Sequence, residues 1–222
     1  MTRDAGYRFW NNPKVVREFY QAEAPGYWRD FLGSFKKPFS YSVLDLGCGG
    51  GRNTELLIKL GFNTWACDLY DLMLKFARKR IFGLIDPEEV RSRILKASML
   101  DLPFEARCFD IIVANGIYHN TTSKSEFIRA IHESSRVLKE NGFLCLNVFY
   151  RGFVAPELKV IKSNKDTFIT HEGLHLTLLS KSQIRKILSE AGFRPQGEIL
   201  SYKRKVSTGF RSVLRGVFKK NQ

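Results

Sequence analysis

The residues best suited to chemistry lie at 45–51, in the run Asp-Leu-Gly-Cys-Gly-Gly-Gly. Asp45 closes an apolar stretch, and glycines then recur at every second position, as Gly47, Gly49 and Gly51. Because glycine has no Cβ, such a loop offers bare backbone that a ligand can approach closely. The pattern therefore predicts a loop that binds a nucleotide-like ligand.

The glycine spacing separates the classes of protein that use such loops. A dinucleotide fingerprint needs G-x-G-x-x-G, and its third glycine would fall on Arg52 or Thr54, depending on which glycine is counted first. The phosphate-binding pattern G-x-x-x-x-G-K-[ST] is not matched either. The loop thus disfavours a nicotinamide oxidoreductase and leaves the pattern D-x-G-x-G-x-G.

Strand and helix signals alternate from Tyr41 onward, which predicts a mostly parallel sheet with helices on both faces. The strands are expected near 42–46, 63–67, 94–97, 109–114 and 143–149, with another from residue 193. In such sheets, ligands bind beyond the carboxyl ends of the strands. Asp68 follows the second strand, where its carboxylate could accept bonds from two ribose hydroxyls or cap the next helix.

Five short motifs occur in order: Val-Leu-Asp-Leu-Gly-Cys-Gly-Gly-Gly at 43–51, Cys-Asp-Leu at 67–69, Leu-Asp-Leu-Pro-Phe at 100–104, Phe-Asp-Ile-Ile-Val-Ala-Asn at 109–115 and Arg-Val-Leu-Lys-Glu-Asn-Gly at 136–142. Their order and spacing resemble small class I S-adenosylmethionine-dependent methyltransferases of the type 11 group. The resemblance implies an α/β, Rossmann-like fold: a seven-stranded, mostly parallel sheet with helices on both faces and an antiparallel last strand. It also implies S-adenosyl-L-methionine as the cofactor.

The resemblance assigns roles to residues at the strand ends. Asp45 and the glycines would contact the methionine portion of the cofactor, Asp68 the ribose, and Ser98 and Met99 the adenine. Many family members carry an acid where Ser98 stands, and a serine hydroxyl can accept the same bond without the charge. The implied cofactor-binding residues are Asp45, Gly47, Cys48, Gly49, Gly51, Asp68, Leu69, Ser98, Met99 and Asn115.

The loop at 115–120 would face both the methyl group and the acceptor. It lacks the paired prolines of nucleic-acid amino-methyltransferases, and no Pro-Cys nucleophile lies nearby, so both nucleobase chemistries are disfavoured. His119 is the candidate general base, because an imidazole with a pKa near 6.5 suits proton removal near neutrality. Tyr118 is the second catalytic candidate. The alternative for His119 is a side chain that only shapes the pocket.

Two segments lie outside the alternation of strands and helices. Residues 1–40 are rich in aromatic residues and are predicted to cap the pocket, where rings would stabilise a sulfonium. The candidate cap residues are Tyr7, Trp10, Tyr20 and Trp28, each of which could instead simply pack on the sheet. Residues 150–179 form an insertion whose His171 and His175 could contact the acceptor or lie on a surface loop. Gly173 lies between these histidines and no third ligand is evident, so no metal is expected.

The chain is strongly basic, with 222 residues and a net charge of +14. Residues 203–222 contain seven Lys or Arg and no acid. Phe210, Val213, Leu214, Val217 and Phe218 recur at helical spacing, which suggests a basic amphipathic helix that contacts an anionic membrane surface or RNA. The alternatives are the last strand of the sheet or a disordered terminus. Four scattered cysteines and the lack of a signal segment predict a cytoplasmic protein, which the basic tail could hold at a membrane surface as a peripheral protein.

These features predict a cap over residues 1–40, a core over 41–202 with the insertion at 150–179, and a tail over 203–222. The predicted function is in-line methyl transfer from S-adenosylmethionine to a small-molecule or lipid-like acceptor. Two alternatives stay open: an RNA or protein methyltransferase that uses the basic surface, and a non-catalytic partner protein that only binds the cofactor.

Overall fold

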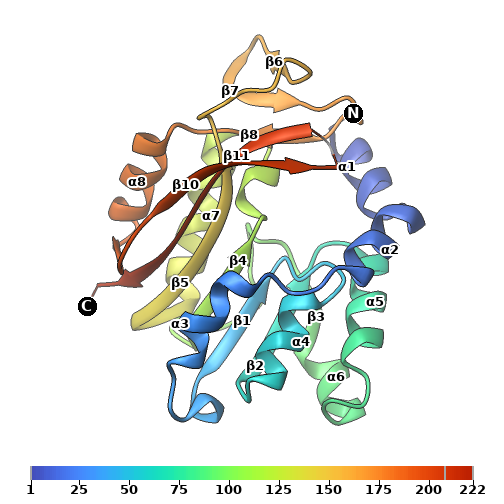
Figure 1. Ribbon diagram of the computed structural model, residues 1–222, viewed down its shortest axis with the longest axis vertical. Coiled ribbons are helices and arrows are strands. Elements are labelled where there is room, and N and C mark those ends of the chain that lie inside the picture. The colour runs from blue at the N-terminus through green and yellow to red at the C-terminus, as the bar shows by residue number, and fades with distance from the viewer. Residues whose placement is uncertain (1, 208, 222) are drawn as a thin grey trace.

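A single large sheet runs through the centre of the molecule (Figure 1). The computed structural model describes residues 2–207 and 209–221. The strand order is β10-β11-β5-β4-β1-β2-β3, and β9 also pairs with β11. The strands of this sheet are β1 (Ser42–Leu46), β2 (Asn63–Asp68), β3 (Ile94–Lys96), β4 (Phe109–Asn115), β5 (Leu138–Tyr150), β9 (Phe193–Pro195), β10 (Leu200–Val206) and β11 (Gly209–Lys220).

The predicted fold class is confirmed. Strands β1 to β5 pair in parallel, whereas β11 runs antiparallel to β5. Strands β9 and β10 both pair antiparallel with β11, one at each end of it. They share a single edge position that is interrupted at 196–199, so eight strands fill the seven predicted positions.

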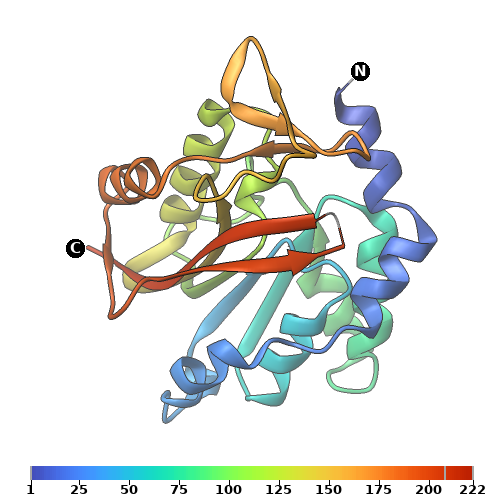
Figure 2. The same ribbon diagram turned by 45° about the horizontal axis from the view of Figure 1, so that its top comes forward.

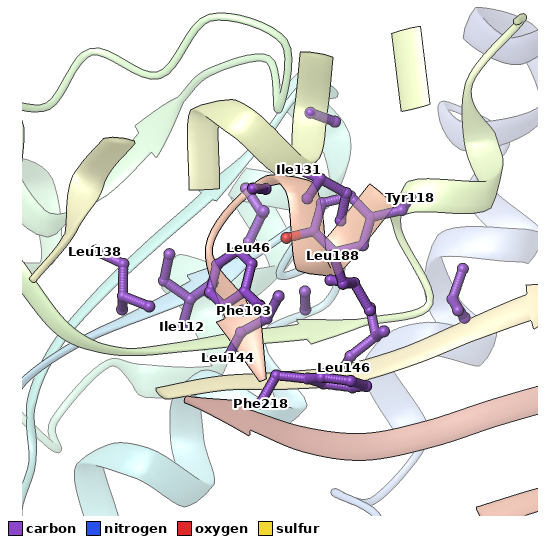
Figure 3. Close-up of a cluster of buried hydrophobic side chains, with 14 of the residues drawn as sticks. Leu46, Ile112, Tyr118, Ile131, Leu138, Leu144, Leu146, Leu188, Phe193 and Phe218 are labelled. Atoms are coloured by element: carbon purple, nitrogen blue, oxygen red, sulfur yellow. The ribbon is translucent and has the colours of Figure 1, made fainter. Parts of the chain in front are cut away.

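Helices cover both faces of the sheet. They are α1 (Thr2–Trp10), α2 (Pro13–Gln21), α3 (Arg29–Gly33), α4 (Arg52–Lys59), α5 (Asp71–Ile81), α6 (Pro87–Arg93), α7 (Lys124–Val137) and α8 (Lys181–Glu190), with 3-10 turns η1 (Gly26–Trp28), η2 (Pro38–Ser40) and η3 (Tyr118–Asn120). On one face, Ile131 of α7 and Leu188 of α8 join Leu46, Ile112 and Leu144 in the largest core cluster (Figure 3). The central strands are nearly continuous apolar runs because both of their faces are buried.

The N-terminal segment divides into two parts. Helix α2 lies beside α5 (Figures 1 and 2), where Tyr20 of α2 contacts Phe76 edge to face, and α1 continues beyond α2. The stretch from η1 to η2 packs instead on the face of the sheet that α4 covers. Trp28 is only 3% exposed and joins Leu32, Val43 and other residues in a core cluster on the α4 face. Only the first part is therefore placed as a cap.

The insertion at 150–179 builds a small sheet of its own, with the order β6-β7-β8. Its strands are β6 (Lys159–Ile161), β7 (Asn164–Ile169) and β8 (His175–Thr177). Both pairings are antiparallel. Leu158, Phe168 and Leu176 bury a separate apolar cluster against Phe149 of the large sheet. This cluster holds the small sheet beside the carboxyl end of β5.

The prediction of an amphipathic helix in the tail is wrong. Residues 209–220 form strand β11, which lies inside the sheet between β5 and β10. An interior strand is buried on both faces, so its apolar residues need not alternate with polar ones. The apolar residues Val213, Leu214, Val217 and Phe218 therefore happen to have the spacing that is typical of an amphipathic helix. The alternative of an antiparallel last strand is the one that the structure bears out. Within the described residues, every helix is too short or too polar to span a bilayer.

A glycine at position 51 should be required for stability. Gly51 has a φ of +82°, and a Cβ there would lie 2.9 Å from the Cα of Ala77 on α5. We expect Gly51→Ala to lower the free energy of unfolding by about 1–3 kcal/mol in urea denaturation. Gly33→Ala is the control, because Gly33 lies in α3 with no atom within 4 Å of the added Cβ. Equal stability of the two variants would contradict the role of Gly51.

Candidate functional site

The loop between β1 and α4 forms one wall of a cavity at the carboxyl ends of the strands. Gly47 and Gly49 have φ angles of +70° and +54°, a region that favours glycine. A Cβ on Gly47 would lie 2.7 Å from the side chain of Ile117. The Gly47 and Cys48 N–H groups both donate to the Cys67 carbonyl at 2.9 Å. These bonds fix the loop against the end of β2 and bring its backbone to the cavity.

Asp45 lies beneath this loop, not in the cavity wall. Its side chain points to the α4 face, where the Thr54 hydroxyl donates to Oδ2 at 2.6 Å. Burial raises the pKa of Asp45 to about 6, and its Oδ1 has no hydrogen-bond partner. Gly51 is likewise outside the cavity wall, since it packs on α5. Neither Asp45 nor Gly51 therefore lines the cavity, and both residues support the loop that does.

Asp68 is placed as the resemblance implies. Its Oδ2 accepts from the Gly49 N–H at 2.9 Å, and its Oδ1 accepts from the Tyr70 N–H at 3.1 Å. Burial raises the pKa of this carboxyl, while the two backbone N–H groups act in the opposite direction. Asp68 therefore links the glycine loop to the end of β2 and still lines the cavity.

The cavity has a volume of about 590 Å³. It brings together most of the predicted residues: Gly47, Cys48, Gly49, Asp68, Leu69, Ser98, Met99, Asn115, Tyr7, Trp10 and His175. The Ser98 hydroxyl also accepts from the Leu100 N–H at 3.2 Å, which orders the turn that carries Ser98 and Met99. Among the described residues, no three His, Cys, Asp or Glu side chains gather as a metal site would need.

Tyr118 and His119, the predicted catalytic residues, are buried outside the cavity wall. His119 is 3% exposed and does not line the cavity; its Nδ1 accepts from the Phe149 N–H at 3.1 Å, and its ring stacks on Phe149. Burial lowers the pKa of His119 to about 3, with the charge of Arg211 acting in the same direction. Tyr118 is fully buried, and its hydroxyl pairs with Ser134 at 2.7 Å. Both residues support the loop from below.

The cap residues behave differently from one another. Tyr7 and Trp10 of α1 line the cavity beside Tyr70, with ring centroids 6.5 and 6.4 Å from that of Tyr70. Tyr20 and Trp28 do not line it, since they pack on α5 and in the core. His175 lines the cavity from β8, and the predicted partner His171 lies outside it on the exposed loop.

Several residues that line the cavity were not predicted from the sequence. Phe19 comes from α2, Glu126 from the first turn of α7, Leu174 from the loop before β8, and Arg52 from the first residue of α4. Arg52 could have been found, because it directly follows the last glycine of the loop. Within the described part of the chain it forms no ion pair, although burial lowers its pKa.

A hydrogen-bonded cluster supports Asn115 at the end of β4. The Tyr27 hydroxyl donates to Asn115 Oδ1 at 2.5 Å. The Asn147 Nδ2 group donates to Tyr27 Oη and to Asn115 Oδ1, both at 2.7 Å. Asn115 and Asn147 are register partners on β4 and β5. Tyr27 and Asn147 were not predicted.

The strand order and the glycine loop define a class I methyltransferase fold. Residues 44–146 match a family model described as a methyltransferase domain of type 11. This stretch is less than half of the chain, and it is similar to that family, as the sequence motifs predict.

Curated relatives carry different functions. The chain is 30% identical over 134 residues to "Probable tRNA methyltransferase 9B" of Mus musculus, covering 60% of this chain and 24% of that protein. It is 27% identical over 160 residues to "Ubiquinone biosynthesis O-methyltransferase, mitochondrial" of Rattus norvegicus, covering 70% and 45%. The chain spans about a quarter to about a half of the length of such relatives.

Solved structures support the fold. A SAM-dependent methyltransferase from Methanosarcina mazei superposes with a TM-score of 0.72 at 16% identity, covering 90% of this chain and 99% of that one. A 1,6-didemethyltoxoflavin-N1-methyltransferase from Burkholderia thailandensis, with 1,6-didemethyltoxoflavin and S-adenosylhomocysteine bound, gives 0.62 at 19% identity, covering 100% and 84%.

His119 should stay uncharged at every pH at which the protein is active. We expect its ring signals, assigned by comparison with His119→Gln, to stay constant in NMR spectra from about pH 8 to about pH 5, because burial holds its pKa near 3. In urea the same ring should titrate near pH 6.5, the ordinary value. A midpoint near 6.5 in the folded protein would restore His119 as a candidate base.

Proposed function

We propose that the protein is an S-adenosylmethionine-dependent methyltransferase that acts on a small-molecule or lipid-like acceptor. The observation that carries this proposal is the joining of Gly47, Gly49 and Asp68 in the wall of one cavity at the carboxyl ends of the strands. The match to the methyltransferase family model and the two similar solved structures support the same cofactor.

The lining residues fit the cofactor part by part. The glycine loop leaves space that a Cβ would fill, next to the Asp68 carboxylate that suits two ribose hydroxyls. The segment 97–99 lies at the end of β3, beside Asp68, and would flank the adenine. Arg52 is a cavity-lining guanidinium with no ion pair among the described residues, so it fits the carboxylate of the methionine portion.

When bound, S-adenosylmethionine supplies a methyl group on a positively charged sulfur that is already a good leaving group. The protein's task is then to hold the acceptor in line with that methyl group and to exclude water. Tyr7, Trp10 and Phe19 close the cavity with aromatic faces, which suit a desolvated cation. Leu174 and His175 close it from the small sheet.

The aromatic and apolar closure favours a small or lipid-like acceptor, since residues of α1 and residues 174–175 at the small sheet both line the cavity. Figure 2 shows α1 and the small sheet at the same end of the molecule. RNA is the second candidate, because of one observation. Strand β10 is an exposed edge rich in cations, and the Lys203 ammonium lies 3.6 Å from the ring centroid of Phe153 and 4.7 Å from that of Phe210. Cations interleaved with rings suit a nucleic acid strand.

Two variants should separate the ribose and carboxylate contacts in calorimetry. Asp68→Asn should weaken S-adenosylhomocysteine and 5′-methylthioadenosine alike, by about tenfold or more, because both carry the ribose. Arg52→Gln should weaken only S-adenosylhomocysteine, by a similar factor, because methylthioadenosine has no carboxylate. Asp86→Asn, at an exposed aspartate with no capping bond, is the control. Failure of the wild type to bind S-adenosylhomocysteine would overturn the proposed function.

The acceptor class can be measured directly. Cell extract incubated with the protein and methyl-tritiated S-adenosylmethionine should be separated into small-molecule, lipid, RNA and protein fractions. We expect the label in the small-molecule or lipid fraction. Label in RNA, reduced by Lys203→Glu, would favour the second candidate, and label in protein would contradict both. Extract without the protein measures the background.

A further inference from the structure

The chemistry of the acceptor atom follows from Asn115. This residue ends β4, which lies on the side of β1 away from β2 and β3. The groups suited to the ribose and adenine lie at the ends of β2 and β3, so Asn115 lines the opposite part of the same cavity. Its position suits contact with the acceptor near the transferred methyl group.

The hydrogen bonds fix which end of the Asn115 amide faces the cavity. Oδ1 accepts from Tyr27 Oη at 2.5 Å and from Asn147 Nδ2 at 2.7 Å, so both of its lone pairs are used. The second proton of Asn147 Nδ2 goes to Tyr27 Oη. If both amides were turned over, the buried side-chain NH₂ of Asn147 would lose its partners. In the observed arrangement the side-chain oxygen Oδ1 of Asn147 is the atom of this cluster that lacks a partner. The observed orientation is the less costly.

The cluster is held from two further directions. The Gly116 N–H donates to the backbone carbonyl oxygen of Asn147 at 2.7 Å, which ties the end of β4 to β5. The Arg215 guanidinium lies 4.1 Å from the centroid of the Tyr27 ring and also donates to the Tyr202 hydroxyl. Asn115 therefore offers the cavity N–H donors and no acceptor.

We propose that the acceptor atom is an oxygen of a hydroxyl, phenol or carboxylate group, held by the Nδ2 group of Asn115. An amino group would need a hydrogen-bond acceptor at this point, because its own N–H groups must be held to aim its lone pair. Here the carbonyl oxygen that could serve is already saturated. An oxygen accepts the N–H bond with one lone pair and keeps another for the methyl group. This inference rests on the proposed function.

The reaction balances as follows for a hydroxyl. The oxygen forms the new C–O bond, and the S–CH₃ bond breaks with its electron pair on sulfur. The hydroxyl proton passes to the imidazole of His175, which lines the cavity from β8. Burial lowers the pKa of His175, which keeps the ring neutral and able to accept a proton, and the charge of Glu126 favours the protonated form. A carboxylate acceptor needs no base.

The test identifies the atom that receives the label. Product formed from trideuteromethyl-labelled S-adenosylmethionine and the active fraction should be analysed by mass spectrometry and NMR. A CD₃ ether or ester is expected; a CD₃ group on nitrogen or carbon would overturn the inference while leaving the proposed function intact. No product despite S-adenosylhomocysteine binding would overturn the proposed enzyme and this inference together. No binding would overturn the cofactor assignment itself.

Variants provide an independent readout. Asn115→Asp keeps the shape but removes the donor, so kcat/KM should fall by about 100-fold, with unchanged affinity for S-adenosylhomocysteine by calorimetry. Tyr27→Phe should free the amide to turn and lower kcat by about tenfold with little change in KM. Tyr41→Phe is the control, since the Tyr41 ring packs on Phe35, away from the cluster. Thermal unfolding checks that each variant folds. Wild-type kinetics in Asn115→Asp, or a Tyr27→Phe effect confined to KM, would contradict the inference.

Discussion

The structure depends on the absence of side chains at two places in one short loop. At Gly47 the backbone passes Ile117 of the neighbouring loop, and at Gly51 it passes the Cα of Ala77 on α5. Because neither position has room for a Cβ, β1, α4, α5 and the loop after β4 converge in a small space. That convergence brings Asp68 within 2.9 Å of the Gly49 N–H and places Asn115 in the same cavity wall. The cavity therefore results from the close approach of these elements.

Two buried ionisable groups beneath this cavity have opposite effects on stability. The pKa of Asp45 is raised to about 6, so the folded state binds the proton more tightly, and Asp45's contribution is lost as pH rises from about 4 through 6. The pKa of His119 is lowered to about 3, so the unfolded state binds more protons, and stability is lost as pH falls below about 6.5. Between about pH 4 and 6 the two effects oppose each other.

The sequence was enough to predict what depends on local pattern. Strands that are buried on both faces read as apolar runs, and the glycine spacing identified the loop and the class of fold. Side-chain direction was harder. His119 follows the strand that supplies Asn115, yet its ring turns into the core and stacks on Phe149. Tyr27 lies 88 residues from Asn115, and Asn147 lies 120 residues from Tyr27, so only the folded sheet could bring them together. The conformation of the tail was predicted wrongly because an interior strand and an amphipathic helix can have the same pattern of apolar residues.

Strand β10 also has a consequence for how copies of the chain meet one another. It lies at the end of the sheet, with β11 on one side, and the backbone on its other side is open to pairing. Such edges invite a second molecule to extend the sheet. Lys203, Arg204 and Lys205 are exposed on this edge, and the edge is broken where β9 gives way to β10 at a glycine, Gly197, with a φ of +88°. Two such edges placed together would bring six like charges side by side, so charge repulsion opposes the extension of the sheet by a second copy.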